Sequence, residues 1–288
     1  MTTLRIVHRT GYEYPDGATA SYNQVRMTPR SSHEQLVLHN RVEISPTAWL
    51  NTYKDYWGTT VTNFEVHERH DTLRVTSTST VDVARPPVVP PGITWEKVRS
   101  PEVTDRHAEM LEITARTEPG EELRGRIREL RRDAATPGHL ARAVSRLVHD
   151  EVAYVSGSTN VHTRAREAWA ERKGVCQDMA HLMIGALRTE WIPARYVSGY
   201  VISAKNPDVG TAYKGESHAW VEYWDGAWTA MDPTNDCEPG EYHVEVAKGR
   251  DYGDVSPLKG IFTGRGHSSM FVSVEMTVLP PDRRAGER

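Results

Sequence analysis

A cysteine at the start of an almost wholly apolar, helix-like run is the feature that most constrains this chain. Cys176 follows Gly174 and Val175, and apolar residues then recur at positions 179, 180, 182, 183, 184, 186 and 187. Apolar side chains over so wide an arc predict a helix that is largely buried. A cysteine in its first turn would lie at the positive end of the helix dipole, which favours the thiolate. Because a free cysteine is usually a small buried hydrophobe, this segment alone favours packing over chemistry.

The composition indicates a globular protein of one or two domains, with 288 residues, 38% of them hydrophobic and 26% charged. The net charge of −4 gives no basic surface for nucleic acid or an anionic membrane, so neither is an expected partner. The chain has no apolar run long enough to span a bilayer and no signal-peptide core at its start. Its two cysteines, Cys176 and Cys237, are no disulfide framework. We therefore expect free thiols and a cytoplasmic location, with a single bridge as the alternative.

We expect no cofactor and no required metal. The sequence has no paired-cysteine zinc pattern and no acidic loop with calcium-ligand spacing. It also has no phosphate-binding glycine loop and no dinucleotide-binding fingerprint.

The first part of the chain, residues 1–84, predicts an antiparallel β-sandwich-like domain. Runs rich in Val and Thr at 37–44, 59–66 and 73–83 are typical of strands, and turn signals such as Tyr14–Gly17 separate the runs. Four prolines in residues 85–92 exclude a helix or a central strand there. We predict a linker at 85–101, with an ordered surface loop as the alternative.

The second part, residues 102–288, predicts an α+β domain. Helical patterns occur at 121–132, from Pro137 to about 150, and at 164–172, and Thr136 is the predicted N-cap of the second. A strand follows the cysteine helix at 195–202. A polar stretch at 203–216 is then predicted to be a loop, long enough to border a cleft or to act as a flap.

A predicted hairpin brings a histidine and an aspartate together. His218 lies in the first strand, Asp225-Gly226 is a strong turn signal, and Asp232 ends the return strand before Pro233. A two-residue turn would place Asp232 on the opposite face from His218. A three-residue loop at 224–226, which pairs Tyr223 with Ala227, would place the two residues directly opposite each other. We predict the three-residue loop.

Cys176, His218 and Asp232 together supply the groups that thiol catalysis needs. A thiol is only slightly ionised at neutral pH, so an imidazole must take its proton. A carboxylate must then hold the other nitrogen of the imidazole. His218 alone could be a histidine whose hydrogen bonds are satisfied within the sheet, and Asp232 alone could be a turn residue that ends a strand. Their joint occurrence with Cys176 instead favours a Cys-His-Asp triad.

The residues around the triad resemble the transglutaminase-like superfamily, whose members are described as cysteine proteases of a papain-like fold. The resemblance also includes the N-terminal β-domain of bacterial transglutaminase-like proteins. The matching segments are Gly174–Leu182, Ile192–Tyr200, Ser217–Glu222, Met231–Asn235, Gly249–Val255, Tyr12–Tyr14 and Arg26–Arg30. The resemblance implies an α+β core with the nucleophile helix packed on an antiparallel sheet. It also implies that Cys176 is the nucleophile, His218 the base and Asp232 the orienting acid.

One residue departs from that family pattern. Trp191 stands where the family usually has glycine, between the cysteine helix and Ile192-Pro193. Glycine there suits a left-handed helix cap, so the turn either differs in shape or carries strain.

The expected chemistry is thiol-dependent acyl transfer or hydrolysis at an amide, through a thioester on Cys176. The substrate would be a glutamine carboxamide or a peptide bond of a protein or peptide. The alternatives are a cysteine protease or amidohydrolase that uses water as acceptor, and a non-catalytic protein-binding module on the same fold. The Cys176 backbone N–H is the expected first oxyanion donor, and Asn160 is a candidate for the second. Asp178 and His181 are expected to make buried hydrogen bonds. Tyr196, Tyr200 and Trp220 are expected to pack in the core, with a cleft wall as the alternative.

Overall fold

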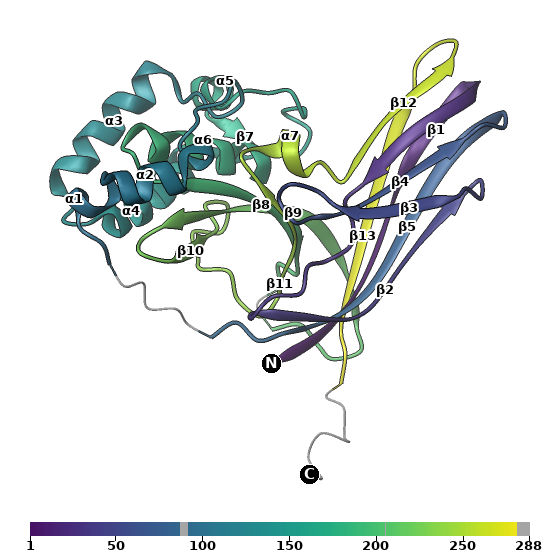
Figure 1. Ribbon diagram of the computed structural model, residues 1–288, viewed down its shortest axis with the longest axis horizontal. Coiled ribbons are helices and arrows are strands. Elements are labelled where there is room, and N and C mark those ends of the chain that lie inside the picture. Colours follow the sequence, from purple (N-terminus) through teal and green to yellow (C-terminus); the bar gives the residue numbers. More distant parts are fainter. Residues whose placement is uncertain (87–91, 205, 281–288) are drawn as a thin grey trace, which may run out of the picture.

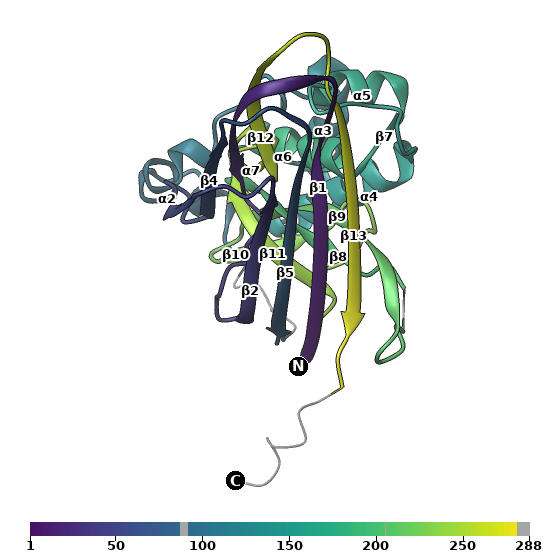
Figure 2. The same ribbon diagram turned by 90° about the vertical axis from the view of Figure 1, so that its right-hand side faces the viewer.

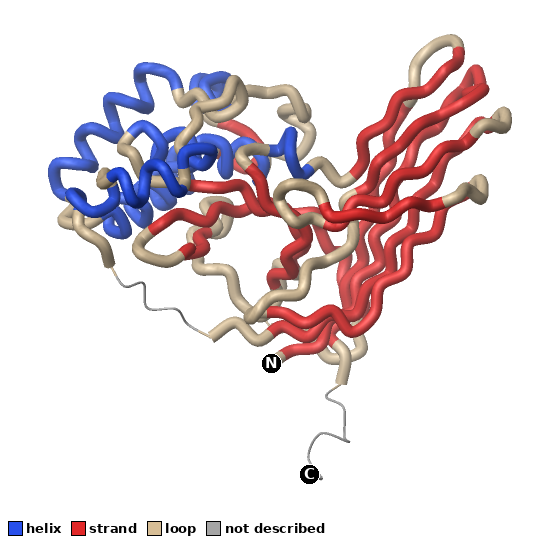
Figure 3. Tube along the Cα trace, viewed as in Figure 1, coloured by secondary structure: helices blue, strands red, loops and turns tan. Residues whose placement is uncertain are grey.

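The computed structural model describes residues 1–86, 92–204 and 206–280, without the side chain of Glu216. A helical end and a β-rich end adjoin in Figure 1, and Figure 3 separates them by colour. The helices are α1 Trp95–Val98, α2 Pro101–Arg106, a 3₁₀ turn Ala108–Met110, α3 Gly120–Asp133, α4 Pro137–Glu151, α5 Ala165–Glu171, α6 Cys176–Thr189 and α7 Tyr252–Val255. The strands are β1 Thr2–Val25, β2 Gln35–Ser45, β3 Leu50–Lys54, β4 Thr60–Val66, β5 His70–Val83, β6 Ala153–Tyr154, β7 Lys173–Gly174, β8 Ala194–Val201, β9 Ala212–Trp224, β10 Trp228–Met231, β11 His243–Gly249, β12 Leu258–Gly264 and β13 Ser269–Val278.

Strand β1 organises the β-rich end because it pairs with four other strands. Its first half lies between β5 and β13, and its second half pairs with β4 and β12. The pairing with β5 is irregular between Glu13 and Ala18, where Gly17 has a φ of +75°. The predicted turn at Tyr14–Gly17 is therefore wrong: these residues form an irregularity inside one long strand.

The antiparallel β-rich N-terminal region and its strands β2, β4 and β5 are confirmed. The end of the chain, however, also joins this region: β12 and β13 pair with β1 (Figure 2), although the sequence placed residues 102–288 in the second domain. The physical reason is that β1 has two edges, and β4 and β5 cover only one of them. On β13, Val274, Met276 and Val278 alternate toward the core and are buried.

The predicted linker at 85–101 is partly helical. It contains α1, whose N-cap Thr94 accepts a hydrogen bond from the Lys97 backbone N–H, and it ends at the first residue of α2. Residues 87–91 of the proline-rich stretch lie outside the described residues.

The predicted α+β core is confirmed, with α6 packed on β8 and β9. All residues of α6 from Gln177 to Arg188 are buried, as the wide apolar arc predicts. The Thr136 side chain caps α4 by accepting the backbone N–H of His139 at 3.2 Å, also as predicted. The polar stretch 203–216 is shorter as a loop than predicted, since β9 begins at Ala212. Residue 205 lies outside the described residues. Within the described residues, no helix is long and apolar enough to cross a bilayer.

Helix α6 ends in a strained turn at Trp191, whose φ is +64°. The Trp191 backbone N–H donates to the Arg188 carbonyl at 3.1 Å, and the Ile192 N–H donates to the Leu187 carbonyl at 3.1 Å. This pair of bonds is a Schellman cap, in which glycine is the preferred residue at the left-handed position. Of the two predicted outcomes, the turn therefore keeps the glycine geometry and carries the strain.

Candidate active site

Cys176 is the first residue of α6, and the helix start is fixed by Asp178. The Asp178 Oδ2 atom accepts hydrogen bonds from the Val175 backbone N–H at 2.9 Å and from Thr159 Oγ1 at 2.6 Å. Asp178 is fully buried, and this burial raises the pKa of its carboxyl. A Cβ on Gly174 would lie 2.8 Å from the Asp178 Cβ, so only glycine allows this close approach. The predicted buried hydrogen bonds of Asp178 are confirmed.

The His218–Asp232 pair forms, but through a different register from the predicted one. Trp224 pairs with Trp228, so the three-residue loop is 225–227 instead of 224–226. The shift is two positions along the ladder, which keeps His218 and Asp232 on one face. The reason is that Trp224 stays in β9: its backbone N–H donates to the Pro193 carbonyl at 2.9 Å, and its ring packs edge-on against Trp228 across the ladder.

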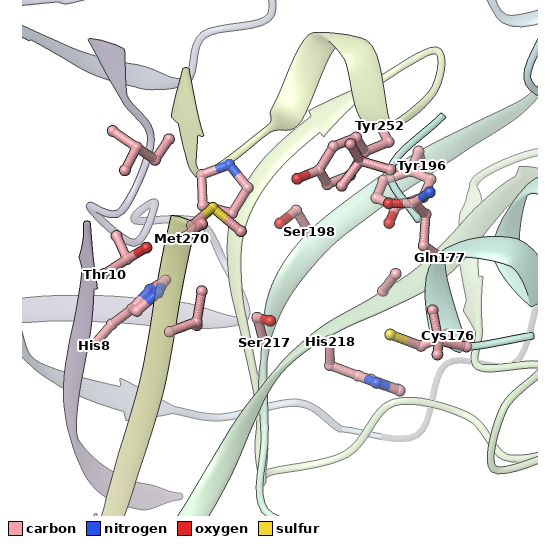
Figure 4. Close-up of a pocket in the computed structure, with 16 residues that line it drawn as sticks. His8, Thr10, Cys176, Gln177, Tyr196, Ser198, Ser217, His218, Tyr252 and Met270 are labelled. Carbon is pink, nitrogen blue, oxygen red and sulfur yellow. The ribbon is translucent and has the colours of Figure 1, made fainter. Parts of the chain in front are cut away.

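His218 lies between a carboxylate and the thiol. Its Nε2 atom is 2.7 Å from Asp232 Oδ2, and Cys176 lines the same pocket and acts on the charge of the ring. Figure 4 shows the Cys176 sulfur and the His218 ring at the same side of the pocket. Burial lowers the pKa of His218, but the interactions with Asp232 and Cys176 outweigh it and raise this pKa to about 10. The imidazole is therefore cationic at neutral pH.

Asp232 is held as a carboxylate by several donors. Its Oδ2 atom accepts Asn235 Nδ2 at 2.6 Å, and its Oδ1 atom accepts the backbone N–H of Thr234 at 2.9 Å. Burial alone would raise the pKa of Asp232, but hydrogen bonds from His218, His243 and Asn235 hold that pKa far below its usual range.

His243 is the residue that sequence reasoning missed. It is buried on β11, and its Nε2 atom is 3.3 Å from Asp232 Oδ2. Its Nδ1 atom accepts the Gly240 backbone N–H at 3.1 Å, so Nε2 carries the proton and donates to Asp232. No local pattern could indicate this contact, because β11 pairs with β8 and not with the hairpin strands. The Asp232-Pro233-Thr234-Asn235 turn, in contrast, is a readable signal for Asn235.

His218, Asp232 and His243 are also the described residues that could hold a metal, since their ligand atoms lie within 4.8 Å of one another. Both histidines donate hydrogen bonds to the same carboxylate oxygen, so each would have to lose its Nε2 proton before it could bind a metal. The expectation of no required metal stays a prediction.

A pocket of about 210 Å³ opens beside the thiol. It is lined by His8, Thr10, Val161, Val175, Cys176, Gln177, Tyr196, Ser198, Ser217, His218, Ala219, Tyr252, Pro257, Leu258, Met270 and Val272. Among the three predicted aromatic residues, Tyr196 lines the pocket, whereas Tyr200 and Trp220 are not among its lining residues and are buried.

The candidate second oxyanion donor, Asn160, does not line this pocket. Its side-chain oxygen instead accepts the His162 backbone N–H at 2.8 Å, which forms a local turn on the surface. The neighbouring Val161 lines the pocket in its place, and Gln177 in the first turn of α6 lines it as well.

His181 makes the buried hydrogen bond expected of it. Its Nε2 atom accepts the Tyr252 backbone N–H at 3.1 Å, and burial lowers the pKa of His181 to about 3. A neutral ring therefore joins α6 to the segment that carries Tyr252 beside the pocket.

Comparison with known proteins identifies the family to which the chain is similar. The model of the bacterial transglutaminase-like N-terminal region matches residues 4–82, and that of the transglutaminase-like superfamily matches residues 124–233. The uncharacterized protein ML0607 of Mycobacterium leprae is 42% identical over 279 residues, covering 97% of this chain and 100% of that protein. The uncharacterized protein Rv2569c of Mycobacterium tuberculosis is 34% identical over 303 residues, covering 96% of this chain and 93% of that protein.

A solved structure supports the fold over nearly the whole chain. The crystal structure of a "Putative Cysteine Protease" from Cytophaga hutchinsonii aligns with a TM-score of 0.76 and 23% identity, covering 98% of this chain and 92% of that one. From the two matching models, the relatives and the shared fold, the chain belongs to the transglutaminase-like superfamily, among the proteins with a bacterial transglutaminase-like N-terminal region.

Proposed function

We propose that this protein is a thiol enzyme that transfers or hydrolyses acyl groups at an amide of a protein or peptide. Cys176 would be the nucleophile, His218 the acid and base, and Asp232 the residue that orients His218. The single observation that carries the proposal is the buried His218–Asp232 pair, with His218 and Cys176 lining the same pocket.

The chemistry follows from these positions. The Cys176 sulfur attacks the amide carbon, and the resulting oxyanion accepts hydrogen bonds from backbone N–H groups at the start of α6, which have no acceptor within the helix. His218, which is cationic at neutral pH, then donates its proton to the departing nitrogen. A thioester remains on Cys176 and an amine or ammonia leaves.

The thioester is then resolved by a second nucleophile. Water gives hydrolysis, and an amine gives transfer, with His218 as the base in either case. Both outcomes use the same residues, so the proposal covers a transglutaminase-like transferase and a cysteine amidohydrolase or protease. A cytoplasmic location also stays a prediction.

The test is direct detection of the thioester. The full chain is mixed with glutamine-containing peptides and with activated acyl esters, quenched in acid and analysed by mass spectrometry. We expect an acyl adduct on Cys176 that is absent from Cys176→Ala. With His218→Ala, the adduct should form at least about 100-fold more slowly. Added methylamine should appear in the product if an amine is the acceptor. An adduct that forms equally well with Cys176→Ala would refute the proposal.

A further inference from the structure

The pocket lies where one strand changes partners. On one edge, β9 pairs with β13 through residues 212–215 and with β10 through residues 221–224. In the part of the chain that the structure describes, no strand pairs with residues 216–220 on that edge. This gap supplies Ser217, His218 and Ala219 to the pocket.

The wall facing Cys176 comes from the β-rich N-terminal region. His8 and Thr10 of β1 and Met270 and Val272 of β13 all line the pocket. In Figure 4, His8, Thr10 and Met270 lie on the opposite side of the pocket from Cys176. Met270 and Val272 are about half exposed, so they are accessible from the pocket mouth.

The described residues that line the pocket offer no partner for a charged substrate group. None of its described lining residues is Asp, Glu, Lys or Arg. His8 is buried, and this burial lowers its pKa to about 4, so the far wall is neutral at physiological pH. Among the described lining residues, the cationic His218 already faces Asp232 and Cys176. A charge on the substrate would be desolvated there without compensation.

The pocket is also small. Its volume of about 210 Å³ is below the roughly 300–1,000 Å³ typical of pockets for drug-sized ligands. It therefore suits a single side chain or a short acyl chain.

We propose that this pocket binds the acyl part of the substrate, that this part is uncharged and apolar next to the reacting carbonyl, and that Met270 and Val272 select it. This inference rests on the proposed function, since it assumes that Cys176 attacks a carbonyl. The substrates would then be amides of short, uncharged acyl groups, and Met270 and Val272 of β13 would discriminate between these and charged acyl groups.

The experiment uses three chloromethyl ketones of equal chain length that end in a methyl, an ammonium or a carboxylate group. The Cys176 thiolate displaces chloride, so that a C–S bond forms and the C–Cl bond breaks. The rate at which each reagent alkylates Cys176 in the full chain is divided by its rate of reaction with glutathione. This ratio removes differences in intrinsic reactivity between the reagents. We expect the methyl-ended reagent to be at least about 10-fold faster than both charged reagents.

Variants of the wall test the assignment to β13. Met270→Asp and, separately, Val272→Asp should shift the preference at least about 3-fold toward the ammonium reagent. Ile261→Asp is the matched control, since Ile261 is 72% exposed on β12 and does not line the pocket. This control should keep the wild-type ratios.

Two results would overturn the proposal. Equal normalised rates for the three reagents, with Cys176 still reacting fast, would exclude the apolar acyl pocket and leave the proposed function standing. A Cys176 that reacts no faster than glutathione with the methyl-ended reagent would overturn both.

Discussion

Replacing Trp191 with glycine should give a more stable protein than replacing it with alanine. At a φ of +64°, a side chain with a Cβ is strained by about 1–2 kcal/mol, and glycine relieves this. Glycine also makes the unfolded chain more flexible, which costs about 0.5–1 kcal/mol. The Trp191 side chain is 55% exposed, and both variants lose the burial of the rest of the indole, so that loss cancels between them. We therefore expect the free energy of unfolding of the glycine variant to exceed that of the alanine variant by about 0.5–1 kcal/mol, or its Tm to be higher by roughly 1–4 °C.

Urea unfolding of three proteins measures this difference. Trp191→Ala is the matched control, because it removes the indole but keeps the strained Cβ. Wild type, Trp191→Gly and Trp191→Ala should unfold with the same m-value, and the glycine variant should have a higher midpoint than the alanine variant. A glycine variant less stable than the alanine variant would show that the turn is not strained, and the argument from the left-handed cap would fail.

Three further predictions concern buried polar groups. Arg188 is 3% exposed and donates to the carbonyls of Ala194 and Arg250. Arg188→Met removes these hydrogen bonds and should lower the free energy of unfolding, measured in urea, by about 3–5 kcal/mol. A loss below about 1 kcal/mol would contradict this. His243→Leu should slow acyl-enzyme formation several-fold and make its rate fall at a higher pH on the acid side, because Asp232 loses a hydrogen-bond donor. His243→Gln can still donate and should restore the wild-type pH–rate profile. Equal pH–rate profiles for wild type and His243→Leu would count against a positioning role for His243. The pKa of His218 is raised to about 10 from an unfolded value near 6.5, so its contribution to stability is complete below about pH 6.5 and is lost as the pH rises through 10. The stability gap between wild type and His218→Gln should thus be larger at pH 6 than at pH 10, and a gap that widens with pH would contradict the assigned shift.

Local patterns in the sequence predicted most elements of the fold. The apolar arc of α6, the Thr136 cap of α4 and the Val- and Thr-rich strands depend on neighbours within a few residues, and the structure has them where the sequence indicates. The proximity of Cys176, His218 and Asp232 could be predicted as well. It follows from the order of the three motifs along the chain and from a hairpin register that keeps His218 and Asp232 on one face of the sheet. Their catalytic roles stay a prediction.

Contacts between distant segments could not be predicted. The hairpin register depends on Trp224, which is held in β9 by a hydrogen bond from its backbone N–H to the carbonyl of Pro193, outside the hairpin. The return of β12 and β13 to β1 satisfies an open sheet edge that no local pattern reveals. His243 reaches Asp232 only because β11 lies beside β8 in the folded sheet. In each case the deciding partner is set by tertiary packing.

The most direct test of the central claim is the rate of Cys176 alkylation by iodoacetamide as a function of pH. Wild type is compared with Cys176→Ala, Cys237→Ala and His218→Ala, each labelled site being identified by mass spectrometry. Burial raises the pKa of Cys237 to about 11, so this thiol should react slowly near neutral pH and serves as the internal reference. The proposed activation of Cys176 by His218 predicts fast labelling of Cys176 at pH 6. This labelling should slow at least about 10-fold with His218→Ala and be unchanged with Cys237→Ala. Labelling of Cys176 no faster than that of a free thiol, with no effect of His218→Ala, would contradict the account and favour a binding module on an enzyme fold.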